Sequence, residues 1–294
     1  MTAILITGGR GQLGSALRRH PWPEEVRLFA PAREELNLLD LAAVAAFLRK
    51  NSVAAIVNAA AYTAVDRAES EIAAAFAANA QIPAVLADAA RQTDAALLHV
   101  STDYVFDGAS PRPYEIDDSV SPLNVYGASK AAGELAALRA PRSAVVRASW
   151  LVGRDGTNFV RTMLGLARRQ DIVRVVTDQR GAPTIAAHLA TALAAIVLRM
   201  TSDRSAPSGV FHFANHGPTT WHGFAAAIFA EGVRQGLPAP RLAAVTSAAY
   251  GAAAARPAHS LLSTRRLEQD YGIRPRPWIE ALPGLVGDII GDEA

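Results

Sequence analysis

A glycine-rich turn near the N-terminus follows a short apolar run and opens a helical pattern. The run covers Ala3–Thr7, and the helix is expected over Gln12–Arg19. The glycines of the turn are Gly8, Gly9, Gly11 and Gly14. Because glycine has no Cβ, such a turn lets the backbone approach a pyrophosphate at a helix N-terminus. The spacing is G-x-x-G-x-x-G rather than G-x-G-x-x-G, and it predicts a dinucleotide site. The alternative is a turn that binds no ligand.

The order of apolar run and helical pattern repeats through the first half of the chain. Further strands are expected at Val26–Ala30, Ala54–Asn58, Ala96–Ser101 and Ala144–Ser149. Helices are expected at Leu41–Lys50, Glu69–Ala78, Pro83–Gln92 and Lys130–Arg139. This alternation predicts an α/β fold of Rossmann type, with a doubly wound parallel sheet covered on both faces.

The alternation weakens beyond Trp150, where proline and glycine are frequent. Helices are expected at Asn158–Arg169, Ile185–Met200 and Trp221–Gln235, and strands at Val173–Val176 and Gly209–Phe213. Loops are expected at Asp203–Gly209, Gly236–Pro240 and Arg256–Pro277. We therefore expect a Rossmann domain over residues 1–150. A smaller, mainly substrate-binding region is expected over residues 151–294, with some segments returning to the Rossmann domain.

Composition favours a packed globular protein and restricts its chemistry. Of the 294 residues, 50% are hydrophobic and 19% are charged, unlike a disordered chain. The absence of cysteine excludes disulfides, thiolate metal ligands and cysteine nucleophiles. A net charge of +2 gives no reason to expect nucleic-acid binding. The sequence shows no signal-peptide pattern, and its longest apolar run, Leu189–Leu198, is too short to span a membrane. A cytoplasmic protein is expected.

Tyr126 and Lys130 lie four residues apart in a helical pattern, so their side chains share one face of the helix. An ammonium group near a phenol favours the phenolate, and Lys130 is expected to lower the pKa of Tyr126. The tyrosine could then exchange a proton near neutral pH. Lysine is rare in this chain, since Lys50 is the only other one. The alternative interpretation is a surface pair with no catalytic role.

Ser101 and Thr102 end the fourth predicted strand. Ligands of such sheets bind beyond the carboxyl ends of the strands. Thr102 could donate a hydrogen bond to a substrate carbonyl and stabilise the charge that develops during reduction. The alternative is that the two hydroxyls only cap the loop.

The end of the second predicted strand bears on the choice of cofactor. A carboxylate there would bind the adenosine ribose, whereas arginine suits a 2′-phosphate. The chain has no acid at the expected place but offers Arg33, and Arg10 lies in the glycine turn. We therefore expect NADPH, with NADH as the alternative; both arginines could also be solvated surface charges.

Longer motifs resemble those of the extended short-chain dehydrogenase/reductases. These are Gly8–Gly14, Asn58–Asp66, Ser101–Gly108 and Tyr126–Lys130. Narrower motifs are Arg67–Ser70, Pro122–Tyr126, Arg147–Trp150, Asn158–Phe159, Asp178–Thr184 and Thr219–Trp221. With these, the chain resembles the dTDP-4-dehydrorhamnose reductase family from residue 3 to about residue 265.

The resemblance implies hydride transfer from NADPH to C4 of dTDP-4-dehydro-β-L-rhamnose, which gives dTDP-L-rhamnose. It implies a catalytic set in which Thr102 polarises the carbonyl, Tyr126 donates the proton and Lys130 also binds the nicotinamide ribose. Asp103 and Trp150 would contact the sugar. The implied cofactor contacts are Gly11, Gln12 and Leu13 at the pyrophosphate, Asn37 and Leu38 at the adenine, and Ala61, Tyr62 and Thr63 after the third strand.

Several positions depart from this family's pattern. Asn37 stands where members commonly have aspartate. Some members bind Mg²⁺ through glutamates at their dimer interface, but the matching positions here are Ser15 and Ala187. We therefore expect no structural metal, with a homodimer as the candidate assembly. The segment Arg256–Ser260 resembles the family's substrate loop only loosely. His259 within it is expected to be a loop residue, since Tyr126 already fills the role of acid.

Two other functions remain as alternatives. One is a nucleotide-sugar epimerase or dehydratase on the same scaffold. A dehydratase usually has an Asp-Glu pair after the catalytic hydroxyl, whereas Asp103 and Tyr104 follow Thr102 here, which favours simple reduction. The other is a non-catalytic regulatory subunit, similar to that of methionine adenosyltransferase. The presence of Thr102, Tyr126 and Lys130 weighs against it.

Overall fold

The computed structural model describes residues 1–292, and its central feature is a parallel sheet of six strands. The strands are β1 (Thr2–Thr7), β2 (Val26–Phe29), β3 (Val53–Asn58), β4 (Ala96–Thr102), β5 (Ser143–Ala148) and β10 (Gly209–Phe213). Their order is β10-β5-β4-β3-β1-β2, and every neighbouring pair is parallel. The predicted α/β fold of Rossmann type is confirmed. The strand order changes direction between β1 and β3, and ligands of such sheets bind at that point.

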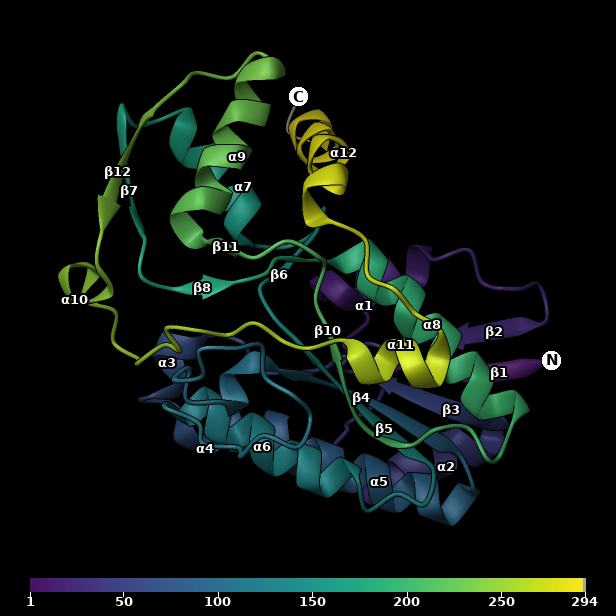
Figure 1. The fold of residues 1–294 in the computed structure, drawn as a ribbon. Coiled ribbons are helices and arrows are strands. Elements are labelled where there is room, and N and C mark those ends of the chain that lie inside the picture. Colours follow the sequence, from purple (N-terminus) through teal and green to yellow (C-terminus); the bar gives the residue numbers. More distant parts are fainter. Residues whose placement is uncertain (293–294) are drawn as a thin grey trace.

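Helices cover both faces of this sheet (Figure 1). On one face lie α1 (Gln12–Arg19) and α8 (Ala186–Ser202), whose Leu17 and Leu193 are fully buried against the strands. On the other lie α2 (Leu41–Lys50), α5 (Ile82–Thr93) and α6 (Val125–Ala137), with Leu48 and Leu86 in that core. Burial on both faces explains why the strands are apolar throughout.

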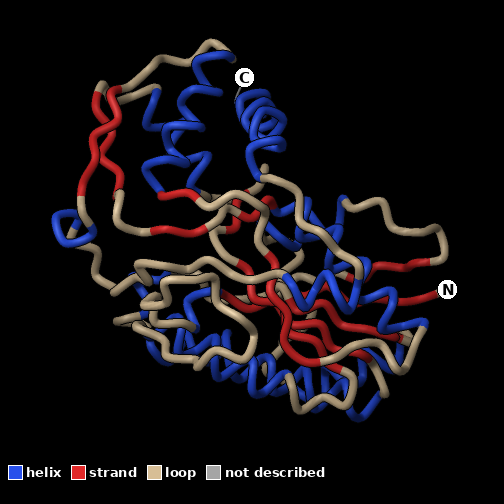
Figure 2. Tube along the Cα trace, in the orientation of Figure 1, coloured by secondary structure: helices blue, strands red, loops and turns tan. Residues whose placement is uncertain are grey.

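A second, smaller core lies beyond one end of the sheet, as Figure 2 shows. It is formed by α7 (Phe159–Ala167), α9 (Trp221–Arg234), α12 (Trp278–Asp292) and the parallel pair of β7 (Ile172–Val176) and β12 (Arg241–Val245). Short pairs connect it to the rest: β6 (Leu151–Val152) with β9 (Thr184–Ile185), and β8 (Arg180–Gly181) with β11 (Thr219–Thr220). Because β10 and α8 join the large sheet, the second half of the chain contributes to both cores. The division at residue 150 stays a prediction.

Several elements differ from the predictions, and the helices α10 (Ser247–Tyr250) and α12 were not predicted. The predicted loop Arg256–Pro277 contains α11 (Arg265–Tyr271), and α10 is a further short helix. The helix expected from Lys130 begins five residues earlier at Val125, because the Asn124 side chain accepts a hydrogen bond from the Gly127 N–H at 2.7 Å and caps it.

The helix predicted at Glu69–Ala78 is divided. It consists of α3 (Val65–Ala68), α4 (Ile72–Phe76) and a π-helical turn, η1 (Ala77–Gln81), that leads into α5. Pro83 has no N–H to donate to the Asn79 carbonyl, which accounts for the irregular turn at this place.

The helical stretch Ile72–Thr93 is long and apolar enough to cross a membrane by length and composition, with a mean hydropathy of 1.3. It packs against α2 and α6 as part of the layer that covers the sheet. Core helices of globular proteins pass the same test, so this single stretch is weak evidence for a membrane span.

Candidate active site

A cleft of about 650 Å³ opens beyond the carboxyl ends of β1, β3 and β4, and we call it the main cleft. It brings together many of the predicted site residues: Gly11, Gln12, Leu13, Ala61, Thr63, Thr102, Asp103, Tyr126, Lys130 and Trp150. It is also lined by Arg10, Tyr104, Leu151, Gly156, Thr157 and Trp221, among others. The predicted residues outside its lining are Gly8, Gly14, Arg33, Asn37, Leu38 and Tyr62.

The glycine turn forms one end of the main cleft. A Cβ on Gly14 would lie 2.1 Å from the Gly8 carbonyl oxygen, and Gly8 itself has a φ of +68° against the backbone of Ala60. Only glycine fits both positions without strain. Gly11 begins α1 without a side-chain cap. The first N–H groups of that helix are therefore free of a capping side chain, as an anion site at a helix N-terminus requires.

Gln12 adds a polar group to this end. Its Nε2 donates to the Leu151 carbonyl at 3.2 Å, while its buried Oε1 has no hydrogen-bond partner among residues 1–292. A buried acceptor without a partner is costly unless a ligand or water satisfies it. The glycine cradle fits the pyrophosphate end of a dinucleotide, whereas the Gln12 Oε1 needs a donor such as a water or hydroxyl group.

The predicted contacts with the adenosine end are more open. Arg10 lines the main cleft and faces Glu34 at 3.8 Å, with both side chains largely exposed. Arg33 is exposed and outside the lining. Asn37 is exposed as well, and its Oδ1 accepts the Leu39 N–H at 3.1 Å. Arg10 is thus better placed in the main cleft than Arg33.

The predicted catalytic residues meet at the floor of the main cleft. Tyr126 and Lys130 project from one face of α6, a turn apart. Thr102, the last residue of β4, hydrogen-bonds Tyr126 and donates through Oγ1 to Asp103 Oδ1 at 3.1 Å. The Tyr126 ring meets Tyr104 edge to face, with centroids 5.5 Å apart. The Lys130 ammonium donates to the Val100 carbonyl at 2.7 Å, and Lys130 as a whole is 2% exposed.

The expected lowering of the tyrosine's pKa is not seen in this arrangement. Burial raises the pKa of Tyr126 to about 12; the neighbouring Thr102 hydroxyl opposes this, and the negative charge of Asp103 adds to it. Burial also lowers the pKa of Lys130 to about 8, against the attraction of Glu134. Desolvation is the largest influence on the phenol, and Tyr126 carries its proton at neutral pH.

Asp103 is a buried carboxyl group at the edge of the same floor. Burial raises its pKa to about 7, although hydrogen bonds from Ser260 and Thr102 act in the opposite direction. Its Oδ2 has no hydrogen-bond partner within residues 1–292. Asp103 as a residue lines the main cleft, although this oxygen is itself buried.

An aromatic wall faces the catalytic residues. The rings of Trp150 and Trp221 stack with centroids 3.7 Å apart, and Phe159 packs on Trp221 at 4.5 Å. Trp150 has a φ of +45°, which is rare for a bulky residue. Gly181 lies under its indole, where a Cβ would come within 2.6 Å of the ring. Trp221 was not predicted as a site residue, although the Thr219–Trp221 motif was a signal for it.

Asn79 is a buried residue beside the site that the sequence motifs did not single out. Its fully buried side chain lies in η1, accepts the Tyr62 N–H at 2.8 Å and donates to the Tyr62 carbonyl at 3.0 Å. The same amide donates to Ser129 Oγ at 3.0 Å, and Ser129 donates to the Tyr126 carbonyl at 2.7 Å. Asn79 thus fixes the segment Ala61–Thr63 to the helix that carries Tyr126. The Tyr62 hydroxyl points to Glu71, at 2.8 Å.

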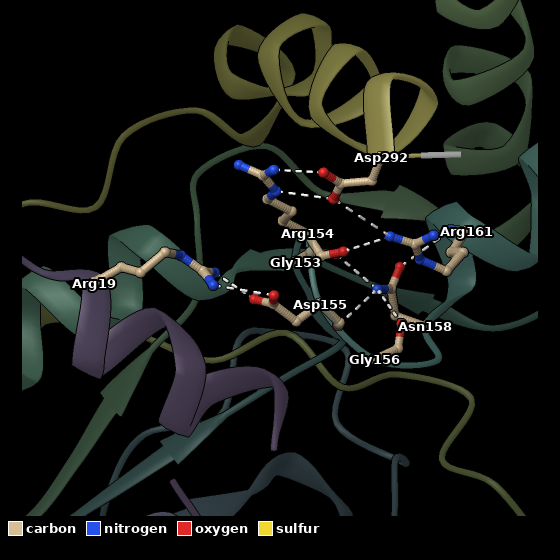
Figure 3. Close-up of polar contacts among 8 residues, drawn as sticks. All are labelled: Arg19, Gly153, Arg154, Asp155, Gly156, Asn158, Arg161 and Asp292. Atoms are coloured by element: carbon tan, nitrogen blue, oxygen red, sulfur yellow. Dashed lines mark hydrogen bonds and ion pairs between the residues drawn. The ribbon is translucent and has the colours of Figure 1, made fainter. Parts of the chain in front are cut away.

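The loop Gly153–Asn158 forms a rim of the main cleft through Gly156 and is held by arginine–carboxylate pairs (Figure 3). Arg19 of α1 pairs with Asp155, and Arg154 pairs with Asp292 at the end of α12. The Asn158 side chain donates to the Gly153 carbonyl at 2.7 Å and caps α7. These contacts fix the rim to both cores.

The segment Arg256–Ser260, which contains His259, lies outside the main-cleft lining. Arg256 pairs with Asp66 at 2.7 Å, and Asn124 Nδ2 donates to the Ala255 carbonyl at 2.7 Å. The His259 N–H donates to the Gly108 carbonyl at 3.1 Å, and His259 is not part of the main-cleft lining. It is a loop residue, as expected.

The positions relevant to a metal lie elsewhere. Ala187 lines a second cleft, of about 350 Å³, beside α1, and Ser15 lies on α1. Residues 1–292 contain no group of three or more His, Asp or Glu side chains placed to hold a metal ion. The expectation of a protein without structural metal stays a prediction.

Comparison with known proteins adds independent information. Residues 1–290 match the family model described as the RmlD substrate binding domain. The chain is 39% identical over 289 residues to a dTDP-4-dehydrorhamnose reductase of Aggregatibacter actinomycetemcomitans, covering 97% of this chain and 98% of that protein. With the enzyme of that name from Salmonella typhimurium it shares 38% identity, over 94% of each chain.

Solved structures agree with these matches. A dTDP-4-dehydrorhamnose reductase from Clostridium acetobutylicum has a TM-score of 0.89 and 33% identity, with 97% of this chain and 99% of that chain covered. The same values hold for the enzyme of that name from Bacillus anthracis, solved in complex with NADP. The family match over nearly the whole chain and the level of identity confirm the resemblance, and the chain belongs to the dTDP-4-dehydrorhamnose reductases, a family of oxidoreductases.

Proposed function

We propose that this protein reduces the C4 keto group of dTDP-4-dehydro-β-L-rhamnose with NADPH and so forms dTDP-L-rhamnose. The observation that carries the proposal is the meeting of the Thr102 hydroxyl, the Tyr126 phenol and the Lys130 ammonium at the floor of the main cleft. Those three groups can polarise a carbonyl, protonate its oxygen and stabilise the anion left behind. The names of the relatives support the same reaction.

The cofactor would lie along the main cleft from the glycine turn to Lys130. Gly11, Gln12 and Leu13 would hold the pyrophosphate. Ala61 and Thr63 would contact the central part of the cofactor. NADPH supplies the hydride in this family of reactions. Arg10 offers a positive charge at the open end for a 2′-phosphate. NADP in the Bacillus anthracis relative favours NADPH over NADH.

Proton transfer is the task of this chain's own residues. Thr102 would donate to the substrate carbonyl oxygen and increase the positive character of C4. With a pKa of about 12, Tyr126 enters the reaction protonated and gives its proton to the oxygen as it becomes an alkoxide. Lys130, whose pKa is about 8, is charged at neutral pH and would stabilise the phenolate that remains. Its ammonium would also bind the nicotinamide ribose.

The sugar nucleotide would bind on the opposite side of this floor. The free Oδ2 of Asp103 would accept a sugar hydroxyl, and Trp150 with Trp221 would offer an apolar face for a sugar or base. This end of the main cleft is shared by the large sheet and the second core, as expected when the second half of the chain binds substrate. We place the reaction in the cytoplasm and propose a homodimer without a bridging metal.

A direct assay tests the proposal. The purified protein is mixed with dTDP-4-dehydro-β-L-rhamnose and either NADPH or NADH, cofactor oxidation is followed, and the product sugar is identified. We expect oxidation of NADPH, slower oxidation of NADH, and dTDP-L-rhamnose as product. Cofactor that stays reduced in both reactions would contradict the proposal and favour an epimerase, a dehydratase or a regulatory subunit. A UDP sugar with the same keto group tests whether the protein requires the dTDP nucleotide.

A further inference from the structure

A buried ion pair lies directly behind the catalytic floor. Glu134 stands one helical turn after Lys130 on α6 and is 4% exposed. Arg147 of β5, 3% exposed, donates to it twice, from Nε to Oε1 at 2.9 Å and from Nη2 to Oε2 at 2.8 Å. Such a two-pronged pair has a well-defined geometry.

The same carboxylate also binds the strand that ends at Thr102. Ser101 Oγ donates to Glu134 Oε1 at 2.5 Å. Ser101 directly precedes Thr102 in β4, whereas Lys130 precedes Glu134 by one turn in α6. One side chain therefore connects the strand that carries the hydroxyl with the helix that carries the phenol and the ammonium.

We propose that Glu134 is a positioning residue of the reductase reaction, which holds Thr102 in register with Tyr126 and Lys130 and places a negative charge one helical turn from the Lys130 ammonium. The inference rests on the catalytic set of the proposed function. Glu134 does not line the main cleft, so it would act only through its neighbours.

The chemistry of the pair points to more than stability. Two charges buried together recover little more than their desolvation cost, and apolar residues of similar size often stabilise a core as well. Here two cations, Lys130 and Arg147, are buried near one anion: Glu134 is hydrogen-bonded to Arg147 and lies one helical turn from Lys130. Removal of the Glu134 charge would leave Lys130 and Arg147 buried without a compensating negative charge from Glu134.

The other ionisable groups around Lys130 do not replace this charge. Burial lowers the pKa of His99 on β4 well below its ordinary value, and burial and Arg147 lower that of His212 on β10 to about 3, so both are neutral. Asp103 in η2 (Asp103–Val105) faces Thr102 and Tyr126. Beyond the end of α3, the Glu69 side chain accepts the Val125 N–H at the start of α6, and Asp66 pairs with Arg256.

The scarcity of lysine provides a direct test of the electrostatic part. With isotope-labelled lysine, NMR of the full chain shows two side chains, Lys50 and Lys130, and the variant Lys50→Arg assigns them. In the wild-type protein Lys130 should titrate near pH 8. In Glu134→Gln its pKa should fall by about one unit or more, because a nearby opposite charge is lost. Lys50, at the far end of α2, should not move.

A control variant tests whether the loss of any buried glutamate charge shifts the Lys130 titration. Glu231 on α9 is also a buried glutamate, and it pairs with Arg234 at 2.8 Å. It lies ten residues beyond Trp221, about 15 Å along the helix from the main cleft. Glu231→Gln should therefore leave the Lys130 titration as in the wild type.

A milder variant tests whether Glu134 positions Thr102. It also tests the proposal if Glu134→Gln does not fold. Ser101→Ala leaves the ion pair of Glu134 with Arg147 intact and removes only its link to β4. We expect kcat to fall by about tenfold or more, because a small displacement of Thr102 spoils the reacting geometry. The KM for NADPH and the Lys130 titration should stay at their wild-type values.

The outcomes distinguish this inference from the proposed function. An unshifted Lys130 titration in folded Glu134→Gln, or wild-type kcat in Ser101→Ala, would overturn the role of Glu134 while wild-type turnover stands. Wild-type protein without turnover would overturn the proposed function instead, and the titration would still report on Glu134.

Discussion

The indole rings of Trp150 and Trp221 stack face to face, with centroids 3.7 Å apart and planes inclined by 10°. Trp150 follows β5 of the large sheet, whereas Trp221 begins α9 of the second core. Both line the main cleft, so the stack joins the two cores across the candidate active site. The two tryptophans are far apart in sequence, and the second half of the chain thereby completes a site that begins in the first.

Trp221→Ala tests whether this stack binds the sugar nucleotide. An aromatic pair contributes about 0.5–1.5 kcal/mol beyond its burial, and a binding loss of about 1.4 kcal/mol corresponds to a tenfold change. We expect the KM for the sugar nucleotide to rise by about tenfold, with little change in the KM for NADPH. Trp22→Phe, beside α1, is the control and should leave both constants unchanged. A rise confined to the NADPH constant would contradict this role.

Gly181→Ala tests the packing of the Trp150 indole against Gly181. The new methyl group would lie within 2.6 Å of the indole, so the ring must move out of its stacked position. Overpacking of this kind costs about 1–3 kcal/mol, and we expect a lower melting temperature together with a higher KM for the sugar nucleotide. Gly284→Ala in α12, which has nothing within 4 Å, should keep both values or raise the melting temperature slightly. Equal effects of the two variants would refute the close packing.

Asp103→Asn tests the burial of the carboxyl group. An aspartate in an unfolded chain has a pKa near 3.9, whereas that of Asp103 in the fold is about 7. Between these values the folded protein holds a proton that the unfolded chain has lost, so Asp103 makes the protein less stable as the pH rises from about 4 to 7.

The asparagine side chain does not titrate, so Asp103→Asn lacks this loss of stability with rising pH. At about pH 8 it should therefore be more stable than the wild type by roughly 4 kcal/mol, and the gain should vanish as the pH falls toward about 4. Denaturant unfolding at several pH values measures this difference. Asp117→Asn, an exposed position, serves as control. A variant less stable than the wild type at the higher pH would contradict the raised pKa.

Metal removal tests the assembly. Ser15 and Ala187 stand where some family members are expected to have glutamates, and neither can ligate Mg²⁺. Treatment with EDTA should change neither the turnover rate nor the mass found by size-exclusion chromatography with light scattering. A lower mass after EDTA, restored by Mg²⁺, would show that a metal joins the protomers.

Local patterns predicted much of this molecule. The helices Gln12–Arg19 and Leu41–Lys50 have the predicted bounds, because their apolar faces repeat with helical period and their ends are marked. The glycine turn and the pair of Tyr126 and Lys130 could be recognised because each motif lies within a few consecutive residues. A site residue whose role depends on its immediate neighbours is visible in the sequence.

Contacts between distant segments could not be predicted in this way. The side chain of Asn79 acts on Tyr62 and Ser129, the latter 50 residues away, and Glu134 binds Ser101 at a separation of 33. The helix α11 was expected as loop because it is short and polar. Its Leu267 is buried only because β10 and α8 lie against it. Nor does spacing reveal that burial raises the pKa of the Tyr126 phenol.

The most direct test of the central claim follows the hydride and the proton together. Wild-type protein and Tyr126→Phe are given dTDP-4-dehydro-β-L-rhamnose and NADPH with deuterium at the transferred position, and the product is examined for deuterium at C4. The wild type should yield dTDP-L-rhamnose deuterated at C4. Tyr126→Phe should bind NADPH normally but turn over about 10²–10⁴-fold more slowly, because it lacks the proton donor. Tyr271→Phe, a tyrosine whose hydroxyl bonds Pro207 far from the main cleft, should match the wild type. Product without deuterium at C4, or wild-type turnover in Tyr126→Phe, would contradict the account.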